Sequence, residues 1–191
     1  MKDLKTRIME LNDIITNNKL KPKTNGDANY KIFDYDPQDR YKVQDYLYNF
    51  LYKNNSNKLV IINIYDTIIN ILKENDYIDI VIEKEREEGT QAANEIIQDV
   101  LGIGTQEDLL KIKIIENIKE NENKIIIITG LEGCFQIIRG HTILAILEGT
   151  VTKNPVIMFY PGTYEDQQTY RLFNKLEHDN GYNATIIAGR N

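Results

Sequence analysis

The sequence predicts an α/β fold with a mainly parallel sheet of about five strands between two helical layers. Three apolar runs, 58–64, 124–129 and 155–160, have the length of strands and are apolar on both faces. Segments with helical periodicity separate these runs, so strands alternate with helices over most of the chain. This alternation is typical of βαβ units with right-handed crossovers, in a P-loop-like or Rossmann-like three-layer arrangement.

The N-terminal part follows this alternation. Its predicted elements are a helix over 2–17, a strand over 30–34, a helix from Asp36 to about Lys53 and the strand 58–64. Asp36 and Pro37 mark a helix start, because aspartate caps the first turn and proline has a preset φ. Asp66 is expected to cap the helix after the strand 58–64.

The remaining elements are predicted in the same way from periodicity and breaks. They are helices over 77–88, 91–101 and 106–120, the strand 124–129, a helical segment over 134–148, the strand 155–160, a helix over 165–177 and a closing strand over 183–187. The stretch 75–121 has no strand pattern and is predicted to be a helical insertion. Pro161-Gly162-Thr163 is expected to turn the chain. No long linker is found, so 1–191 is predicted to be a single domain.

Composition excludes several classes of protein. The chain has 191 residues, a formal net charge of −6 and one cysteine, so an intrachain disulfide is impossible. The acidic balance argues against direct nucleic-acid binding, which usually requires a basic surface. The sequence has no secretory signal and no apolar run of about 18 residues, so we expect no membrane contact and a cytoplasmic location.

The turn after the strand 124–129 raises the question of phosphate binding. A P-loop needs a glycine-rich loop that ends in a lysine, but here Gly130 and Gly133 are followed by Cys134 and Phe135. A simple tight turn is the better interpretation. A degenerate nucleotide-binding fold that has lost its phosphate loop stays open.

Metal and nucleophile chemistry are weakly supported, so no metal or cofactor is predicted. The two histidines and one cysteine have no zinc-binding spacing. Carboxylates at strand ends could hold Mg²⁺ if they converged, although helix capping also explains two of them; they are Asp34, Asp36, Asp66 and Glu132. Cys134 and His141 are seven residues apart, about 10 Å on one helix, which is too far for proton transfer.

Two further features each leave two interpretations. Gly140 interrupts a helical pattern, so Arg139 and His141 could bind an anion at a helix junction or satisfy backbone carbonyls. Thr142 could cap the restarted helix. Four tyrosines lie on or beside the helix that starts at Asp36, and they favour either an interface or core packing; they are Tyr41, Tyr46, Tyr48 and Tyr52.

Several blocks occur in an order that matches one known family. They are Ile32 to Pro37 (IFDYDP), Ile62 to Asp66 (INIYD), Thr129-Gly130, Arg139-x-His141-Thr142-Ile143-Leu144, Pro155 to Tyr164 (PVIMFYPGTY) and Gln168-x-x-Arg171-Leu-Phe-x-x-Leu176. The chain thereby resembles the BrxB family of bacteriophage exclusion (BREX) systems, over about residues 4 to 187. The FYPGxY…RLF block is the most specific part.

The resemblance implies a cytoplasmic component of an anti-phage system that marks host DNA by methylation. It also implies a non-catalytic assembly or adaptor role with the BREX protein PglZ as the expected contact, other BREX components being possible, and it supplies no catalytic residues. The candidate partner or ligand surface is Asp34, Tyr35, Glu132, Arg139, His141, Tyr160, Tyr164 and Arg171. The alternative is a degenerate nucleotide-binding or phosphate-ligand enzyme or sensor at the strand tips, around Asp34, Glu132 and Tyr164.

Overall fold

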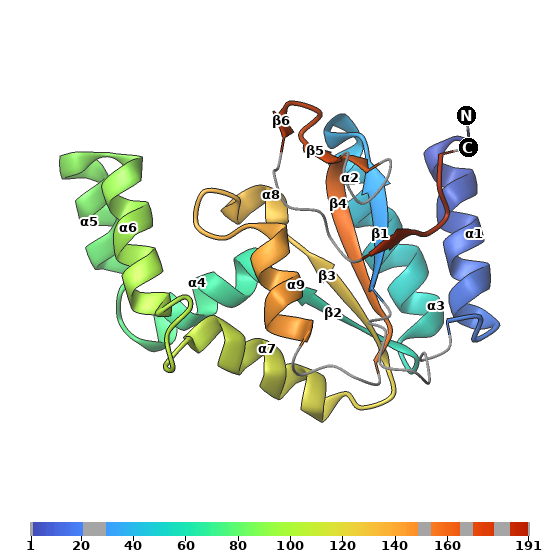
Figure 1. Ribbon diagram of the computed structural model, residues 1–191, viewed down its shortest axis with the longest axis horizontal. Helices are drawn as coiled ribbons and strands as arrows, with labels where there is room; N and C mark the ends of the chain where they lie inside the picture. Colours follow the sequence, from blue (N-terminus) through green and yellow to red (C-terminus); the bar gives the residue numbers. More distant parts are fainter. Residues whose placement is uncertain (1, 21–29, 149–153, 165–169, 178–183, 191) are drawn as a thin grey trace.

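Five parallel strands form the centre of the computed structural model, which describes residues 2–20, 30–148, 154–164, 170–177 and 184–190. They are β1 (Tyr30–Tyr35), β2 (Leu59–Asn63), β3 (Ile125–Thr129), β4 (Val156–Tyr164) and β7 (Thr185–Ile186). Their order across the sheet is β2-β3-β4-β1-β7, and every neighbouring pair is parallel (Figure 1). The predicted mainly parallel sheet of about five strands is confirmed.

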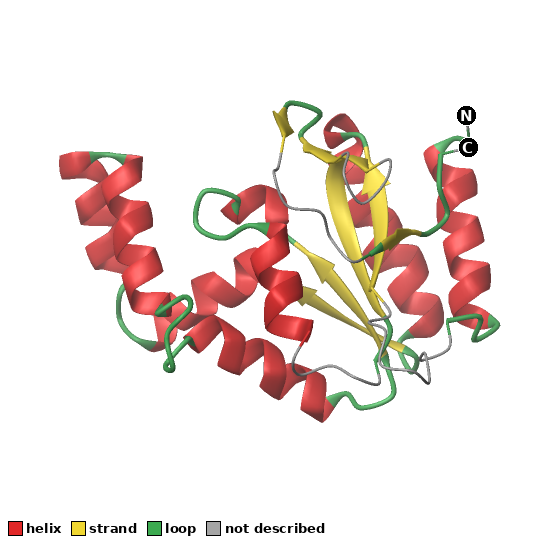
Figure 2. Cartoon of the chain, viewed as in Figure 1, coloured by secondary structure: helices red, strands yellow, loops and turns green. Residues whose placement is uncertain are grey.

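Helices cover both faces of this sheet, as predicted (Figure 2). One face is covered by α1 (Leu4–Thr16) and by a helical run composed of η1 (Pro37–Asp39), α2 (Arg40–Asp45), the π-helical segment η2 (Tyr46–Tyr52) and α3 (Lys53–Asn55). The other face is covered by α4 (Ile64–Glu74), α7 (Leu109–Glu120), α8 (Leu131–Cys134) and α9 (Gly140–Glu148). Each layer buries its own apolar cluster against the strands.

The predicted helices within 75–121 are confirmed, and two of them extend away from the sheet. Helices α5 (Ile78–Glu88) and α6 (Thr90–Leu101) pack against each other and form a hairpin that projects from the body of the molecule (Figure 1). We call residues 78–101 the α5–α6 arm. None of the helices in the described part of the chain is long and apolar enough to cross a membrane.

Of the three residues predicted to cap helices, one does so in the structure and two do not. The Asp36 side chain accepts a hydrogen bond from the backbone N–H of Gln38, with Pro37 at the first helical position, as expected. Helix α4 is capped by Asn63, which accepts from the backbone N–H of Asp66, so the prediction that Asp66 is the cap was wrong. Asp66 instead lies in the first turn of α4, where its charge still favours the helix. Helix α9 begins at Gly140, so Thr142 is not its cap.

The prediction of a helix over 165–177 was wrong. The described part of that segment contains two short strands, β5 (Tyr170–Leu172) and β6 (Leu176–Glu177), which add antiparallel pairing to the end of β4. Strand β4 continues through Pro161 and Gly162 to Tyr164, so these residues do not turn the chain. The extended end of β4 offers backbone groups that β5 pairs with, and this antiparallel pairing overrides the helical periodicity of the segment.

Candidate functional site

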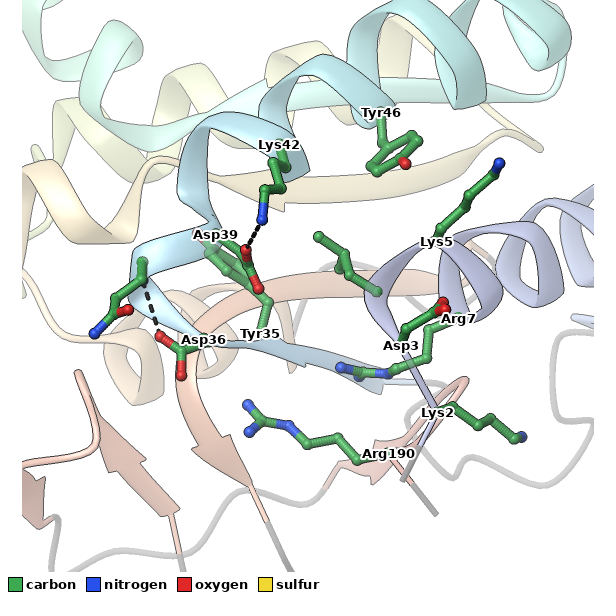
Figure 3. Close-up of a pocket in the computed structure, with 12 residues that line it drawn as sticks. Lys2, Asp3, Lys5, Arg7, Tyr35, Asp36, Asp39, Lys42, Tyr46 and Arg190 are labelled. Atoms are coloured by element: carbon green, nitrogen blue, oxygen red, sulfur yellow. Dashed lines mark hydrogen bonds and ion pairs between the residues drawn. The ribbon is translucent and has the colours of Figure 1, made fainter.

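A hollow lies at the carboxyl end of β1, between α1, α2 and the C-terminal segment. It has a volume of about 530 Å³ and is shown in Figure 3. Five basic side chains line it: Lys2, Lys5, Arg7, Lys42 and Arg190. Tyr35 and Tyr46 supply its aromatic wall. The carboxyl ends of parallel strands are where α/β proteins commonly bind their ligands. We call this hollow the Arg7–Arg190 pocket.

A buried ion-pair cluster forms one side of the Arg7–Arg190 pocket. Asp34 is 2% exposed and Arg7 is 3% exposed, and their Oδ1 and Nη2 atoms lie 2.7 Å apart. The Nε of Arg190 lies 2.7 Å from the other carboxylate oxygen of Asp34. One carboxylate therefore balances two guanidinium groups, and the cluster carries a net positive charge.

Backbone carbonyls hold both arginines in place. The Nε of Arg7 donates to the carbonyl oxygen of Ala188 at 2.7 Å, and the Nη2 of Arg190 donates to that of Gly162 at 2.7 Å. Burial lowers the pKa of Arg7, although Asp34 opposes this effect; the nearby positive charge of Arg190 also lowers that pKa. The cluster thus ties α1, β1, β4 and the C-terminal segment together.

A second hollow of about 280 Å³ lies over the ends of β2 and β3. Its lining includes Arg40, Asp66 and Glu132, from elements of both helical layers. The Glu132 Oε2 and the Thr129 Oγ1 atoms are buried and have no hydrogen-bond partner among the described residues. They line an adjoining cavity of about 20 Å³, the volume that about one water molecule needs. Burial raises the pKa of Tyr35, which also lines this cavity, and the charge of Glu132 adds to the rise.

The sequence-predicted site residues do not meet in one place. Asp34 and Tyr35 lie at the Arg7–Arg190 pocket, whereas Glu132 lies at the second hollow. Tyr160 and Tyr164 are buried in the core, and the Tyr164 hydroxyl donates to the carbonyl oxygen of Ala184 at 3.0 Å.

The three remaining candidates lie on the far helical layer and on the antiparallel extension. The Arg139 guanidinium lies 5.7 Å from the centre of the Phe135 ring, next to the break before α9. His141 lies in the first turn of α9, and Arg171 is exposed on β5. Anion binding and contacts with backbone carbonyls both stay predictions for Arg139 and His141.

The thiol of Cys134 is buried by the fold, and this burial determines its reactivity. The thiol is 1% exposed, and its Sγ lies 3.2 Å from the carbonyl oxygen of Gly130 as a hydrogen-bond donor. Burial, with the charge of Glu132, raises its pKa from 9.0 to about 12. The position is that of a packed, unreactive thiol.

The raised pKa of Cys134 gives a direct prediction. At pH 8 the native thiol should react with a disulfide reagent about a thousandfold more slowly than the unfolded chain, because the thiolate fraction falls tenfold per pKa unit. Between pH 9 and 12 only the unfolded thiol ionises, so this group lowers the free energy of unfolding as pH rises through that window. Labelling with and without urea measures the first effect. Equal rates in both conditions would contradict it.

Sequence reasoning missed two residues that line the Arg7–Arg190 pocket, Arg7 and Arg190. Arg7 stands on the apolar side of the helix 2–17, between Leu4 and Leu11, and a charge at such a position signals a buried partner. Arg190 lies 156 residues after Asp34 in the sequence, and no local pattern connects the two. Only the fold brings them together.

Among the tyrosines of the helical run after β1, three face solvent. Tyr41 is 67% exposed, Tyr48 42% and Tyr52 41%, whereas Tyr46 is partly buried beside the Arg7–Arg190 pocket. Of the two interpretations from sequence, this exposure favours an interface for those three. Arg40 stacks on Tyr41, with its guanidinium carbon 4.4 Å from the ring centre, and donates to the Tyr41 hydroxyl.

The fold and these hollows define a Rossmann-like α/β protein whose glycine turn after β3 lacks the lysine of a phosphate loop. The described residues bring together no group of three or more His, Cys, Asp or Glu side chains that could hold a metal ion.

Comparison with known proteins gives the family. A family model described as BREX protein BrxB matches residues 60–187. A BREX protein BrxB from Bacillus cereus (strain H3081.97) is 31% identical over 158 residues, which cover 81% of each chain. Another from Escherichia coli O9:H4 (strain HS) is 27% identical over 179 residues, covering 86% of this chain and 87% of that one. The chain belongs to the BrxB family of BREX proteins. No solved structure matches it.

Proposed function

We propose that this chain is a non-catalytic assembly partner in a cytoplasmic BREX anti-phage system, and that it docks on a PglZ-type protein through the α5–α6 arm. Family membership supports the BREX context. The observation that carries the docking role is the arm itself, which projects from the sheet and combines exposed apolar side chains with a strong negative charge.

Helix α5 keeps part of its apolar surface exposed, although it packs against both α6 and α4. Its first turns contain Ile78, Ile80, Val81 and Ile82, which together occupy about half of the helix circumference at 100° per residue. None of the residues in α5 is buried, and Ile80 and Ile82 are 47% and 41% exposed. Ile80 lies three and seven residues before Glu83 and Glu87 and therefore shares their face of α5, whereas Ile82 lies about 160° away around the helix. An exposed isoleucine on this acidic face is the apolar feature that we assign to a partner contact.

The charge of the arm indicates the chemistry of the partner. Residues 78–101 contain seven acidic and two basic side chains, so the arm accounts for a net charge of −5 out of the −6 of the whole chain. A surface of this sign is complementary to a basic groove, and it repels nucleic acid. We therefore propose that the arm binds a basic surface of the partner protein, with Ile80 at the apolar centre of the contact.

Co-purification with the PglZ protein from the same BREX system tests this proposal. The wild-type chain should co-elute with PglZ, and the double substitution Glu83→Lys with Glu87→Lys should weaken the complex by about tenfold or more, because two charges are reversed on one exposed face. The measurement is the dissociation constant by calorimetry at two salt concentrations, with weaker binding at high salt.

A matched control reverses the same charges at the same spacing on another helix. Glu116→Lys with Glu120→Lys lies on α7, where both side chains are exposed, and it should leave the affinity within about twofold. If the wild-type chain shows no complex with PglZ, the assembly role fails. If the complex forms and both double variants weaken it equally, the role stands and the arm as its docking element fails.

A further inference from the structure

At one wall of the Arg7–Arg190 pocket, positive charge exceeds negative charge. Two of the five basic side chains that line the pocket have a carboxylate each, because Lys2 pairs with Glu10 at 2.8 Å and Lys42 with Asp39 at 2.7 Å. The two guanidinium groups of Arg7 and Arg190 share the single carboxylate of Asp34. The contacts of Arg7 and Arg190 with Asp34 and with backbone carbonyls use Nε and Nη2 in both residues. Each guanidinium has five N–H donors, so these contacts do not exhaust its capacity.

The position of Arg7 makes this excess costly for the protein alone. Arg7 is near the N-terminal end of α1, a helix of 13 residues, where the helix dipole favours negative charge. The N-cap of α1 is Asp3, whose carboxylate already lies at this helix end, whereas the first turn itself contains Lys5 and no acidic residue. Arg7 is a buried cation that lies beside the positive end of a helix and beside a second guanidinium. A bound anion would be stabilised by all three positive groups.

The rim carboxylates are already engaged. Asp3 accepts from the backbone N–H of Thr6 at 2.7 Å, and Asp36 accepts from that of Gln38 at 2.9 Å. Asp39 pairs with Lys42 at 2.7 Å. Figure 3 shows the Arg7 and Arg190 side chains reaching toward β1 from α1 and from the C-terminal segment, so both guanidinium groups gather at one wall of the pocket.

From this geometry we infer that the pocket binds the phosphate group of a small phosphorylated molecule. Two guanidinium groups fit the oxygens of a phosphate with paired hydrogen bonds. The volume of about 530 Å³ exceeds that of inorganic phosphate and suits a whole small-molecule ligand, with Tyr35 and Tyr46 beside its non-phosphate part. This inference is independent of the docking role, because none of these residues belongs to the α5–α6 arm.

Calorimetric titration of the full chain tests the inference. The probes are inorganic phosphate, ribose 5-phosphate, AMP and the dicarboxylate malonate, at constant ionic strength. The phosphate compounds should bind saturably with a stoichiometry of one, the esters more tightly than inorganic phosphate, and malonate at least about tenfold more weakly than the esters. Comparing ribose 5-phosphate with AMP shows what the pocket recognises. Equal affinities indicate recognition of the phosphate ester alone, and tighter binding of AMP indicates added contacts with its base.

Three variants assign the binding to this pocket. Arg190→Gln should weaken ester binding by about tenfold, whereas Arg86→Gln, which removes the same charge from an exposed site on α5, should change it by less than about twofold. Asp36→Asn keeps a capping side chain and removes a rim charge, so it should strengthen binding about threefold.

The inference is overturned by any of three results. These are no saturable binding of any phosphate compound, binding of malonate as tight as that of the esters, and equal effects of Arg190→Gln and Arg86→Gln. If Arg190→Gln does not fold, the Asp36→Asn variant decides: unchanged or weaker ester binding then counts against the pocket.

Discussion

Replacing Asp34 by alanine is expected to lower the free energy of unfolding by about 3–5 kcal/mol, because it leaves buried positive charge without its carboxylate. Arg7 is almost fully buried and would lose its ion pair, keeping the Ala188 carbonyl and the Phe33 ring, whose centre lies 4.6 Å from the guanidinium carbon. Arg190 would lose its ion pair at the same time. Urea denaturation followed by far-UV circular dichroism measures the change.

The control for Asp34→Ala is the same substitution at an exposed ion pair, Asp39→Ala. Asp39 pairs with Lys42 at 2.7 Å, but both side chains are solvent-accessible, so Asp39→Ala should cost at most about 1 kcal/mol. A loss for Asp34→Ala no larger than that of the control would show that the buried cluster does not stabilise the fold.

Replacing Gly130 by alanine is expected to destabilise the protein by about 3 kcal/mol. Gly130 has φ +81°, and a Cβ there would lie 1.9 Å from the Asn63 Oδ1 atom. A left-handed conformation costs a residue with a Cβ roughly 1–2 kcal/mol. The clash also displaces the side chain that caps α4, and loss of such a cap costs about 0.5–2 kcal/mol. The same urea titration measures the change.

Gly104 separates the two contributions to that loss. It has the same φ of +81°, but a Cβ there meets nothing within 4 Å. Gly104→Ala should therefore show the conformational cost alone, about 1–2 kcal/mol. If Gly130→Ala is no worse than Gly104→Ala, the close approach between β3 and the Asn63 cap is not what requires glycine at position 130.

Most of the sheet was predictable because its signals are local. The runs 58–64, 124–129 and 155–160 are apolar on both faces, and such runs become covered parallel strands in almost any α/β arrangement. The helices of the 75–121 insertion were also predicted, since their periodicity and the break at Gly102 to Thr105 lie within the elements themselves. Their projection as an arm was not predictable, because it depends on what the rest of the chain leaves uncovered.

The helix expected over 165–177 shows where local signals fail. Tyr170, Phe173 and Leu176 have helical spacing, yet the described residues of that segment pair with the end of β4. Gly162 allows this pairing, because a Cβ there would lie 2.1 Å from the Arg171 carbonyl oxygen. The glycine signals close backbone approach, which the sequence analysis interpreted as a turn.

The candidate site was predictable only in part. Asp34 and Tyr35 follow from the rule that strand ends carry function, and both lie at the Arg7–Arg190 pocket. Tyr160 and Tyr164 come from the same rule but are buried, because β4 is a central strand covered by helices and by its antiparallel extension.

The sequence by itself determined the α/β class, the strand cores and the BrxB resemblance, because each depends on residues close together in the chain. Only the tertiary structure decided which charges share a site. Arg7 and Arg190 come from opposite ends of the chain and meet on Asp34 because α1 and the C-terminal segment both pack beside β1. Electrostatic pairing depends on distance in space, and the topology of the sheet sets that distance.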